Sequence, residues 1–207
     1  MPRVSSKQIE SRKNEIIDAC ALLYKEMSFK DITIKEIGKI TSFTRTSIYN
    51  YFQTKEEIFL ALLEREYNDW VRQLNDMKQE KKTGTEDEFS SLLAHTLEER
   101  PMLLKLLSMN HYDMEENSRM ENLIEFKKSY GATMNALKDC LSYFFVDMSE
   151  EKKQSFIYSF FPFMFGVYPY TVVTEAQKKA MQQADVPYVY YSVYDLIYNF
   201  TKQLLKY

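Results

Sequence analysis

The stretch TIKEIGKITSFTRTSIYNYFQTKEEI, residues 33–58, decides the fold that we predict for this chain of 207 residues. Thr33 precedes Glu36 by three residues, and Thr54 precedes Glu57 by the same spacing. In a capping box, the threonine hydroxyl accepts a hydrogen bond from the first helical turn, and the glutamate accepts one from the threonine backbone. We therefore expect a short helix to begin at Thr33 and a long helix at Thr54.

Between these two helix starts, the pattern predicts a second short helix over residues 44–52. Ile48 and Phe52 lie four positions apart and share its buried face. Gly38, in the preceding helix, weakens that helix and is expected where another helix approaches closely. The exposed face of residues 44–52 carries hydrogen-bonding side chains and no acidic one: Thr44, Arg45, Thr46, Ser47, Tyr49 and Asn50.

This polar face suits the major groove of DNA, since two short helices joined by a tight turn place the second helix there. Arg45 can form two parallel hydrogen bonds with a guanine edge, and the Thr46 methyl group can contact thymine. The helix start at Thr54 presents N–H groups suited to a phosphate, with Lys55 beside it. The alternative is a solvated surface on a small helical domain.

The segment resembles the helix-turn-helix of the TetR family of bacterial transcriptional regulators. The likeness covers roughly residues 8–63 and depends on the run from Tyr49 to Glu57, YNYFQTKEE. The chain departs from the family pattern at the turn, where Thr41-Ser42 replaces a small residue and Gly, and at Thr46, where the family has a small residue or Pro.

The resemblance implies a DNA-binding regulator rather than an enzyme. It implies phosphate contacts from Thr33, Ser47, Tyr49 and Lys55. From their side-chain chemistry, Arg45 and Thr46 are the expected base contacts, and Thr44 and Asn50 are further candidates for contact with DNA.

Charge divides unevenly along the chain, whose formal net charge is −3. Residues 1–53 carry 9 Lys or Arg and 6 Asp or Glu, whereas residues 54–207 carry 18 and 24. A basic N-terminal part on an acidic body fits a protein in which only that part contacts phosphate. We therefore predict a DNA-binding domain over 1–53 and a regulatory and dimerisation domain over 54–207.

Other site chemistries find little support in the sequence. Cys20 and Cys140 are the only cysteines, and Cys20 falls on an apolar helical stripe, so we expect a core residue; a redox pair is the alternative. The two histidines have no metal-ligand spacing. We expect no metal ion and no cofactor. An N-terminal signal peptide is not expected either, which indicates the cytoplasm.

The uncharged run 154–174 is long enough to span a bilayer. It contains Pro162, Gly166 and Pro169, however, and we interpret it as a buried helix with no membrane role.

The rest of the sequence predicts an all-α protein of about nine helices, because Gly and Pro are few and apolar residues recur at helical spacing. We expect a bracing helix over 8–28, a long helix from Thr54 to about Lys82 that stops at Gly84, and a helix starting at Pro101. Residues 110–119 are expected to form a loop and 175–187 a polar connector, and Pro187 is expected to start the last helix.

The resemblance implies that the C-terminal part forms a homodimer and binds a small-molecule effector. Two-fold helix-turn-helix proteins read two half-sites about one DNA turn apart. Helices around 150–173 and 187–205 are apolar on more than one side and are the predicted dimer surface; burial within one subunit is the alternative. Predicted effector contacts are Trp70, Phe126, Tyr130, Phe160, Met164 and Tyr168, each of which plain core packing also explains. These side chains favour an apolar or planar effector, with a cation as the second option.

The sequence and the resemblance together predict a ligand-responsive transcriptional regulator that binds a palindromic operator as a dimer; the resemblance favours repression and leaves activation open. The alternative is a helical interaction protein whose helix-turn-helix contacts another protein.

Overall fold

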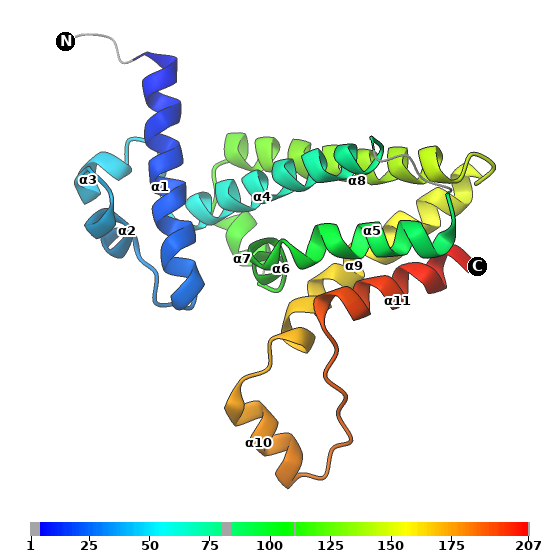
Figure 1. The fold of residues 1–207 in the computed structure, drawn as a ribbon. Helices are drawn as coiled ribbons and strands as arrows, with labels where there is room; N and C mark the ends of the chain where they lie inside the picture. Colours follow the sequence, from blue (N-terminus) through cyan, green and yellow to red (C-terminus); the bar gives the residue numbers. More distant parts are fainter. Residues whose placement is uncertain (1–4, 80–83, 110, 207) are drawn as a thin grey trace. The chain divides into compact units, whose positions relative to one another are not determined.

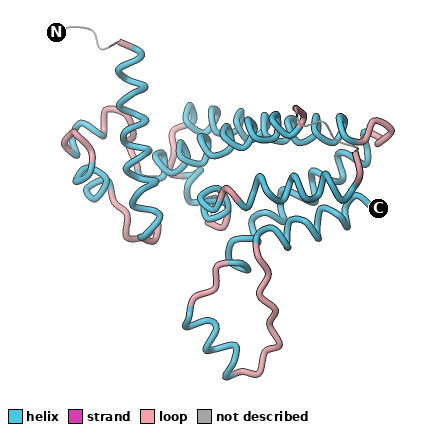
Figure 2. Tube along the Cα trace, in the orientation of Figure 1, coloured by secondary structure: helices cyan, strands magenta, loops and turns pink. Residues whose placement is uncertain are grey.

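The computed structural model describes residues 5–79, 84–109 and 111–206, and all regular structure in these ranges is helical (Figures 1 and 2). This confirms the predicted all-α fold, with eleven helices in the described ranges where about nine were expected. The helices are α1 (Ser6–Glu26), α2 (Ile34–Ile40), α3 (Arg45–Ile48), α4 (Lys55–Met77), α5 (Glu86–Glu98), α6 (Pro101–Leu107), α7 (His111–Glu116), α8 (Met120–Phe144), α9 (Glu150–Thr171), α10 (Glu175–Gln183) and α11 (Val193–Lys206).

Three expectations about the C-terminal elements were wrong. The predicted loop at 110–119 contains the short helix α7, apart from residue 110, which lies outside the described residues. The predicted connector at 175–187 contains α10, which starts with a complete capping box between Thr174 and Gln177. The last helix starts at Val193 rather than at Pro187, because the Ser192 hydroxyl accepts from the Asp195 backbone N–H at 3.0 Å.

The chain forms two compact units. One consists of Met1–Glu66 with Asn110–Tyr130, and the other of Tyr67–Met109 with Gly131–Tyr207. Helices α4 and α8 each contribute residues to both units. The predicted domain boundary after Gln53 falls inside the first unit, because the first turns of α4 belong to the same unit as the two short helices.

The first unit has its own core, which holds α2 and α3 on α1 and on the start of α4. Ile16 and Cys20 of α1, Ile37 of α2 and Ile48 of α3 are fully buried. Phe59 of α4 is also buried and meets the Tyr24 ring edge-on, with centroids 5.1 Å apart. Cys20 is thus a core residue of this unit, as expected, and its burial raises the pKa of the thiol.

The second unit packs α11 along α5 and α9, as Figure 1 shows. Its core is aromatic: the rings of Phe156 and Phe160 stack at 5.5 Å, and those of Phe163 and Phe200 at 3.9 Å. Cys140 is buried here, and burial raises the pKa of its thiol to about 11.

Helix α10 extends from the second unit between two loops (Figures 1 and 2), and none of its residues is buried. Within the described ranges, no single helix has the length and apolarity to cross a membrane; α9 and α10 meet those criteria only as a pair, bent by 84°.

Helix α4 ends at Met77 rather than near Lys82, and residues 80–83 lie outside the described residues. Gly84, the predicted stop, has φ +73°, in the left-handed region that favours glycine.

Candidate nucleic-acid interface

Threonine hydroxyls start both short helices of the first unit. The Thr33 hydroxyl accepts from the Glu36 backbone N–H at 3.2 Å, and the Thr44 hydroxyl accepts from the Ser47 backbone N–H at 3.3 Å. The predicted cap at Thr33 is therefore present. The second half of the predicted capping box is replaced, because the Glu36 carboxylate pairs with Lys39 at 2.7 Å. Both caps fix the point at which each helix leaves its loop.

The second short helix is shorter than the predicted 44–52. Helix α3 covers Arg45–Ile48 and is followed by a turn, in which the backbone N–H of Tyr51 and that of Phe52 both donate to the Ile48 carbonyl, at 2.9 and 3.0 Å. Ile48 and Phe52 are buried, as their spacing predicts. The recognition segment, residues 44–52, is thus one helical turn continued by a hydrogen-bonded turn.

The polar side of the recognition segment faces outward. Thr44, Arg45, Thr46 and Asn50 are exposed, Ser47 is half-buried, and Tyr49 is 41% exposed. The Arg45 guanidinium donates to the Tyr49 hydroxyl at 3.1 Å and lies 5.7 Å from the centre of that ring. Tyr49 therefore holds the arginine on the outer face, where a guanine edge would meet it.

The turn between α2 and α3 forms without glycine. Thr41 ends α2 with φ −93°, an ordinary extended conformation. Its hydroxyl donates to the Phe43 carbonyl at 3.2 Å, and the Ser42 backbone N–H donates to the Glu15 carboxylate of α1 at 2.5 Å. These two hydrogen bonds to side chains stabilise the turn at the position where the family pattern has a glycine that can adopt a positive φ.

Lys55 sits at the start of α4, where the sequence places it, but its ammonium already has two partners. It donates to the Phe29 carbonyl at 2.8 Å and to the Ile32 carbonyl at 3.2 Å, and it lies 4.1 Å from the centre of the Phe29 ring. An ammonium has three donors, so one N–H is left for a phosphate oxygen.

Arg12 of α1 is a basic residue that sequence reasoning missed. Its guanidinium donates to the Tyr51 hydroxyl at 3.1 Å and lies 6.0 Å from the centre of the Phe43 ring. Arg12 precedes Tyr51 by 39 positions, and no local motif links them. The fold therefore adds a positive charge beside the recognition segment.

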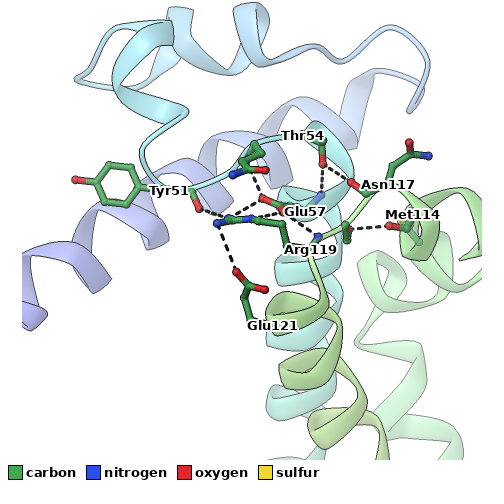
Figure 3. A network of polar contacts seen from close by, with 9 residues as sticks. Tyr51, Thr54, Glu57, Met114, Asn117, Arg119 and Glu121 are labelled. Carbon is green, nitrogen blue, oxygen red and sulfur yellow. Dashed lines mark hydrogen bonds and ion pairs between the residues drawn. The ribbon is translucent and has the colours of Figure 1, made fainter.

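An ion pair between the buried carboxylate of Glu57 and the half-buried guanidinium of Arg119 lies at the other end of the recognition segment (Figure 3). Glu57, only 1% exposed, accepts from the Arg119 guanidinium at 2.6 and 2.9 Å and from the backbone N–H of Gln53 at 2.7 Å. The same guanidinium donates to the Tyr51 carbonyl at 3.2 Å. The predicted Thr54 cap is present, but Glu57 binds the Gln53 N–H one residue earlier than predicted.

These contacts set the charge state of the pair. Burial opposes ionisation of Glu57, but hydrogen bonds from the Arg119 side chain and from the Gln53 and Arg119 backbones outweigh it and lower the pKa. The hydrogen bond to Glu57 in turn raises the pKa of Arg119. Both groups are therefore charged at neutral pH.

The six predicted effector residues are distributed over both units. Phe126 and Tyr130 belong to the first unit, whereas Trp70, Phe160, Met164 and Tyr168 belong to the second. Trp70 is fully buried, and its indole N–H donates to the Thr96 hydroxyl at 2.9 Å. Three surface hollows in the described parts of the chain are lined by other residues, among them one of about 250 Å³ between α8 and α9 that includes Met134 and Tyr158.

Two short helices packed on α1, the second carrying an exposed and acid-free face, are the arrangement of a helix-turn-helix DNA-binding protein. The family model for bacterial regulatory proteins of the tetR family matches residues 16–62, and that for the tetracyclin repressor-like C-terminal domain matches residues 64–204. The chain belongs to the TetR family. It is a DNA-binding transcriptional regulator, and proteins of this class are not enzymes.

Curated relatives match in part of their length. The uncharacterized HTH-type transcriptional regulator YdgC of Bacillus subtilis is 38% identical over 73 residues, which are 35% of this chain and 36% of YdgC. The HTH-type transcriptional repressor AcnR of Corynebacterium diphtheriae is 29% identical over 62 residues, 30% of this chain and 33% of AcnR. The chain thus spans about a third of the length of these relatives.

Solved structures share the fold over nearly the whole chain. The transcriptional regulator FadR from Bacillus subtilis, solved in complex with stearoyl-CoA, superposes with a TM-score of 0.53 at 19% identity, covering 93% of this chain and 96% of FadR. At this identity, the likeness shows that the fold is shared.

Proposed function

We propose that the chain is a ligand-responsive repressor that acts in the cytoplasm. A dimer binds a palindromic operator through α2 and α3, and a small molecule bound in the C-terminal part releases it. In this proposal residues 1–53, together with Lys55 at the start of α4, contact DNA, and the rest of 54–207 binds the effector and dimerises. Release requires the effector to bind the DNA-incompetent state more tightly than the DNA-bound state.

The observation that carries DNA binding is the outward face of the recognition segment. Its six polar side chains are exposed or half-buried, and none is acidic. Arg45 and Thr46 are the proposed base contacts, and the phosphate contacts are Thr33, Thr44, Ser47, Tyr49, Asn50 and Lys55. We add Arg12 to the phosphate contacts because it lies against Tyr51. Repression is proposed from the likeness to AcnR.

The dimer is supported by an exposed stripe on α9. Ser155, Tyr158, Pro162, Phe165 and Pro169 are exposed and follow one another at spacings of three and four residues. Such spacing aligns side chains on one helical face, and this face carries no charge. Apolar residues aligned on one exposed helix face are typical of a helix–helix interface between subunits. The stripe lies inside the predicted dimer surface at 150–173.

The effector is proposed to have an apolar or planar part, because the residues proposed to contact it include Trp70, Phe160 and Met164, which are apolar and fully buried. The likeness to FadR, solved with stearoyl-CoA, favours an acyl chain over a small polar ligand. Phe126, Tyr130 and Tyr168 complete the proposed set. A cation that stacks on tyrosine and tryptophan is the second option.

Selection of duplexes from a random pool tests the DNA half of this proposal. We expect a palindrome, and binding that weakens steeply as salt rises, because phosphate contacts release counterions. Arg45→Ala should cost about 1–3 kcal/mol on the selected site and relax sequence choice. Equal losses on selected and scrambled duplexes would remove Arg45 from the base contacts.

Lys55→Ala should weaken all duplexes alike and lower the salt slope by about one. Its thermal unfolding must be measured in parallel, because Lys55 also holds the Phe29 and Ile32 carbonyls. The control is Lys179→Ala, which removes the same charge from the exposed helix α10. A protein that ignores every duplex at low salt contradicts the proposal and leaves the interaction-protein alternative.

Trp70 is the only tryptophan in the sequence, so its fluorescence tests the effector-binding part of the proposal. Titration with stearoyl-CoA, resorcinol or tetraphenylphosphonium probes the acyl, planar and cationic classes, and a binding class should change Trp70 emission and release the operator. Trp70→Phe serves as the fluorescence blank. Operator release without any change in Trp70 emission would place the effector away from Trp70.

A further inference from the structure

The recognition segment is too short to fix its own direction. Helix α3 has four residues, and helices shorter than about 12 residues are marginal in isolation. Its orientation must therefore come from contacts at its two ends. At the first end, the Thr44 hydroxyl caps the helix. At the second end, α3 itself provides no hydrogen-bond partner for the Tyr51 carbonyl or for the Gln53 N–H.

The pair Glu57–Arg119 takes up both of these backbone groups. Arg119 donates to the Tyr51 carbonyl, and Glu57 accepts from the Gln53 N–H. Arg119 also donates its own backbone N–H to Glu57 at 3.1 Å, and the Thr54 hydroxyl donates to the Asn117 carbonyl at 2.9 Å. Figure 3 shows these groups converging where the recognition segment, the start of α4 and the residues before α8 meet.

A planar guanidinium is suited to this arrangement because it presents several donors in a fixed fork. One ammonium group cannot reproduce the two bonds to Glu57 and the bond to Tyr51 in the same geometry. The carboxylate accepts from four N–H groups, so its buried charge is fully satisfied. An ion pair with one buried partner is weak evidence for stability, whereas its bonds to two backbone positions fix local geometry.

We propose that Glu57 and Arg119 are positioning residues for DNA recognition, holding the exit of the recognition segment at a fixed angle to α4. Neither residue contacts DNA. Arg119 immediately precedes α8, a helix that continues to Phe144, so a shift of α8 moves the guanidinium that holds Tyr51. This inference rests on the proposed function and identifies the residues through which an effector would act on DNA contacts.

The test compares affinity for the selected operator with affinity for a scrambled duplex. Arg119→Met should lower operator affinity about tenfold and scrambled-duplex affinity by less than about twofold, since non-specific binding needs charge more than geometry. Arg119→Lys keeps the positive charge but loses the planar guanidinium, and it should also lower the ratio of operator affinity to scrambled-duplex affinity. Glu57→Gln should also lower the ratio of operator affinity to scrambled-duplex affinity. The double variant Glu57→Gln/Arg119→Met should lose no more operator affinity than Arg119→Met alone, because the two residues act as one unit.

Lys127→Met is the matched control. It removes one positive charge near the start of α8 and breaks the exposed 2.6 Å ion pair with Glu115 of α7, without contact to the recognition segment. It should leave the operator-to-scrambled ratio unchanged.

The measured ratio of affinities distinguishes a positioning role for Arg119 and Glu57 from a purely structural one. A purely structural role would lower the melting temperature and the active fraction equally on both duplexes, with an unchanged ratio in the folded protein. If Arg119→Met does not fold, Arg119→Lys and Glu57→Gln carry the test. An unchanged ratio in folded variants overturns the positioning role alone, whereas wild-type protein that binds no duplex overturns the proposed function.

Discussion

Glu57 is a buried carboxylate whose charge depends on four hydrogen bonds. Its pKa is lowered from the ordinary value of 4.5. A group whose pKa is lower in the folded state contributes stability above its unfolded pKa and loses it as pH falls through the folded pKa. The contribution of Glu57 is therefore complete above about pH 4.5 and disappears in more acidic solution.

Glu57→Gln should lower the free energy of unfolding by about 1–3 kcal/mol at pH 7, the usual cost when a buried donor set loses a charged acceptor. The difference between wild type and variant should shrink as pH falls below 4.5. Urea unfolding at pH 7 and at pH 3.5 measures it. Most of the difference at pH 7 should persist in 1 M NaCl, because the Glu57 carboxylate is buried and its hydrogen bonds are poorly screened by salt. A constant difference at both pH values contradicts the role given to the ionised carboxylate.

Residue roles divide according to the distance over which they act. The Thr33 and Thr44 hydroxyls each accept from a backbone N–H three positions later. Such a short spacing is visible in the sequence, and the Thr33 cap was predicted from it, whereas the Thr44 cap was not. Lys55 pairs with carbonyls more than twenty positions away, and Glu57 with Arg119 sixty-two positions away. No local pattern encodes such partners, and the sequence therefore assigned Glu57 only to a cap.

At the scale of helices and loops, Gly38 and Gly84 differ in whether the surrounding atoms leave room for a Cβ atom. A Cβ added at Gly38 would lie 3.5 Å from the Arg45 backbone nitrogen and 3.6 Å from the Ile48 Cδ1 atom, both ordinary contacts. A Cβ added at Gly84 would lie 2.6 Å from the Phe144 carbonyl oxygen, and φ there is +73°. The close approach expected at Gly38 therefore leaves room for one methyl group, whereas Gly84 has none.

Gly38→Ala should raise the free energy of unfolding by about 0.5–1 kcal/mol, because alanine loses less backbone entropy in a helix. Gly84→Ala should lower it by about 1–3 kcal/mol through backbone strain. Chemical denaturation of both variants beside wild type tests the pair. Destabilisation by Gly38→Ala would show that α2 and α3 approach more closely than ordinary contact distance.

The element predictions succeeded where a long apolar repeat or a cap fixes the helix. Pro101 starts α6, as expected, and the Thr85 and Ser149 hydroxyls cap the starts of α5 and α9. They failed for α7 and α10, which have six and nine residues. Such helices show too few turns for a periodic pattern, and α10 buries no side chain, so it has no apolar face to detect.

At the scale of the whole molecule, composition and periodicity sufficed for the all-α class, and the motif sufficed for the family. They did not show that residues 110–130 belong to the same compact unit as the helix-turn-helix. That grouping depends on contacts between segments separated by some sixty residues, such as Thr54 with Asn117. The compact unit therefore extends beyond Gln53, where charge and motif alone place the boundary of the predicted DNA-binding domain.

The proposed dimer gives the last prediction. Tyr158 and Phe165 lie seven positions apart on α9 and are 65% and 36% exposed. In a two-fold interface each subunit presents the same face to its copy, so a glutamate introduced there meets desolvation and a second negative charge. Tyr158→Glu and Phe165→Glu should each weaken dimerisation by about two orders of magnitude, since like charges across an interface cost several kcal/mol.

Sedimentation equilibrium measures this directly, with Val146→Glu as the control. Val146 is 83% exposed and lies in the loop between α8 and α9, so the same charge placed there should leave the dimer intact. Operator affinity should fall with the dimer, because one recognition segment engages one half-site. A wild-type monomer at micromolar concentration contradicts the dimer, whereas a dimer that tolerates both α9 variants and loses stability with Val146→Glu places the interface at the α8–α9 loop.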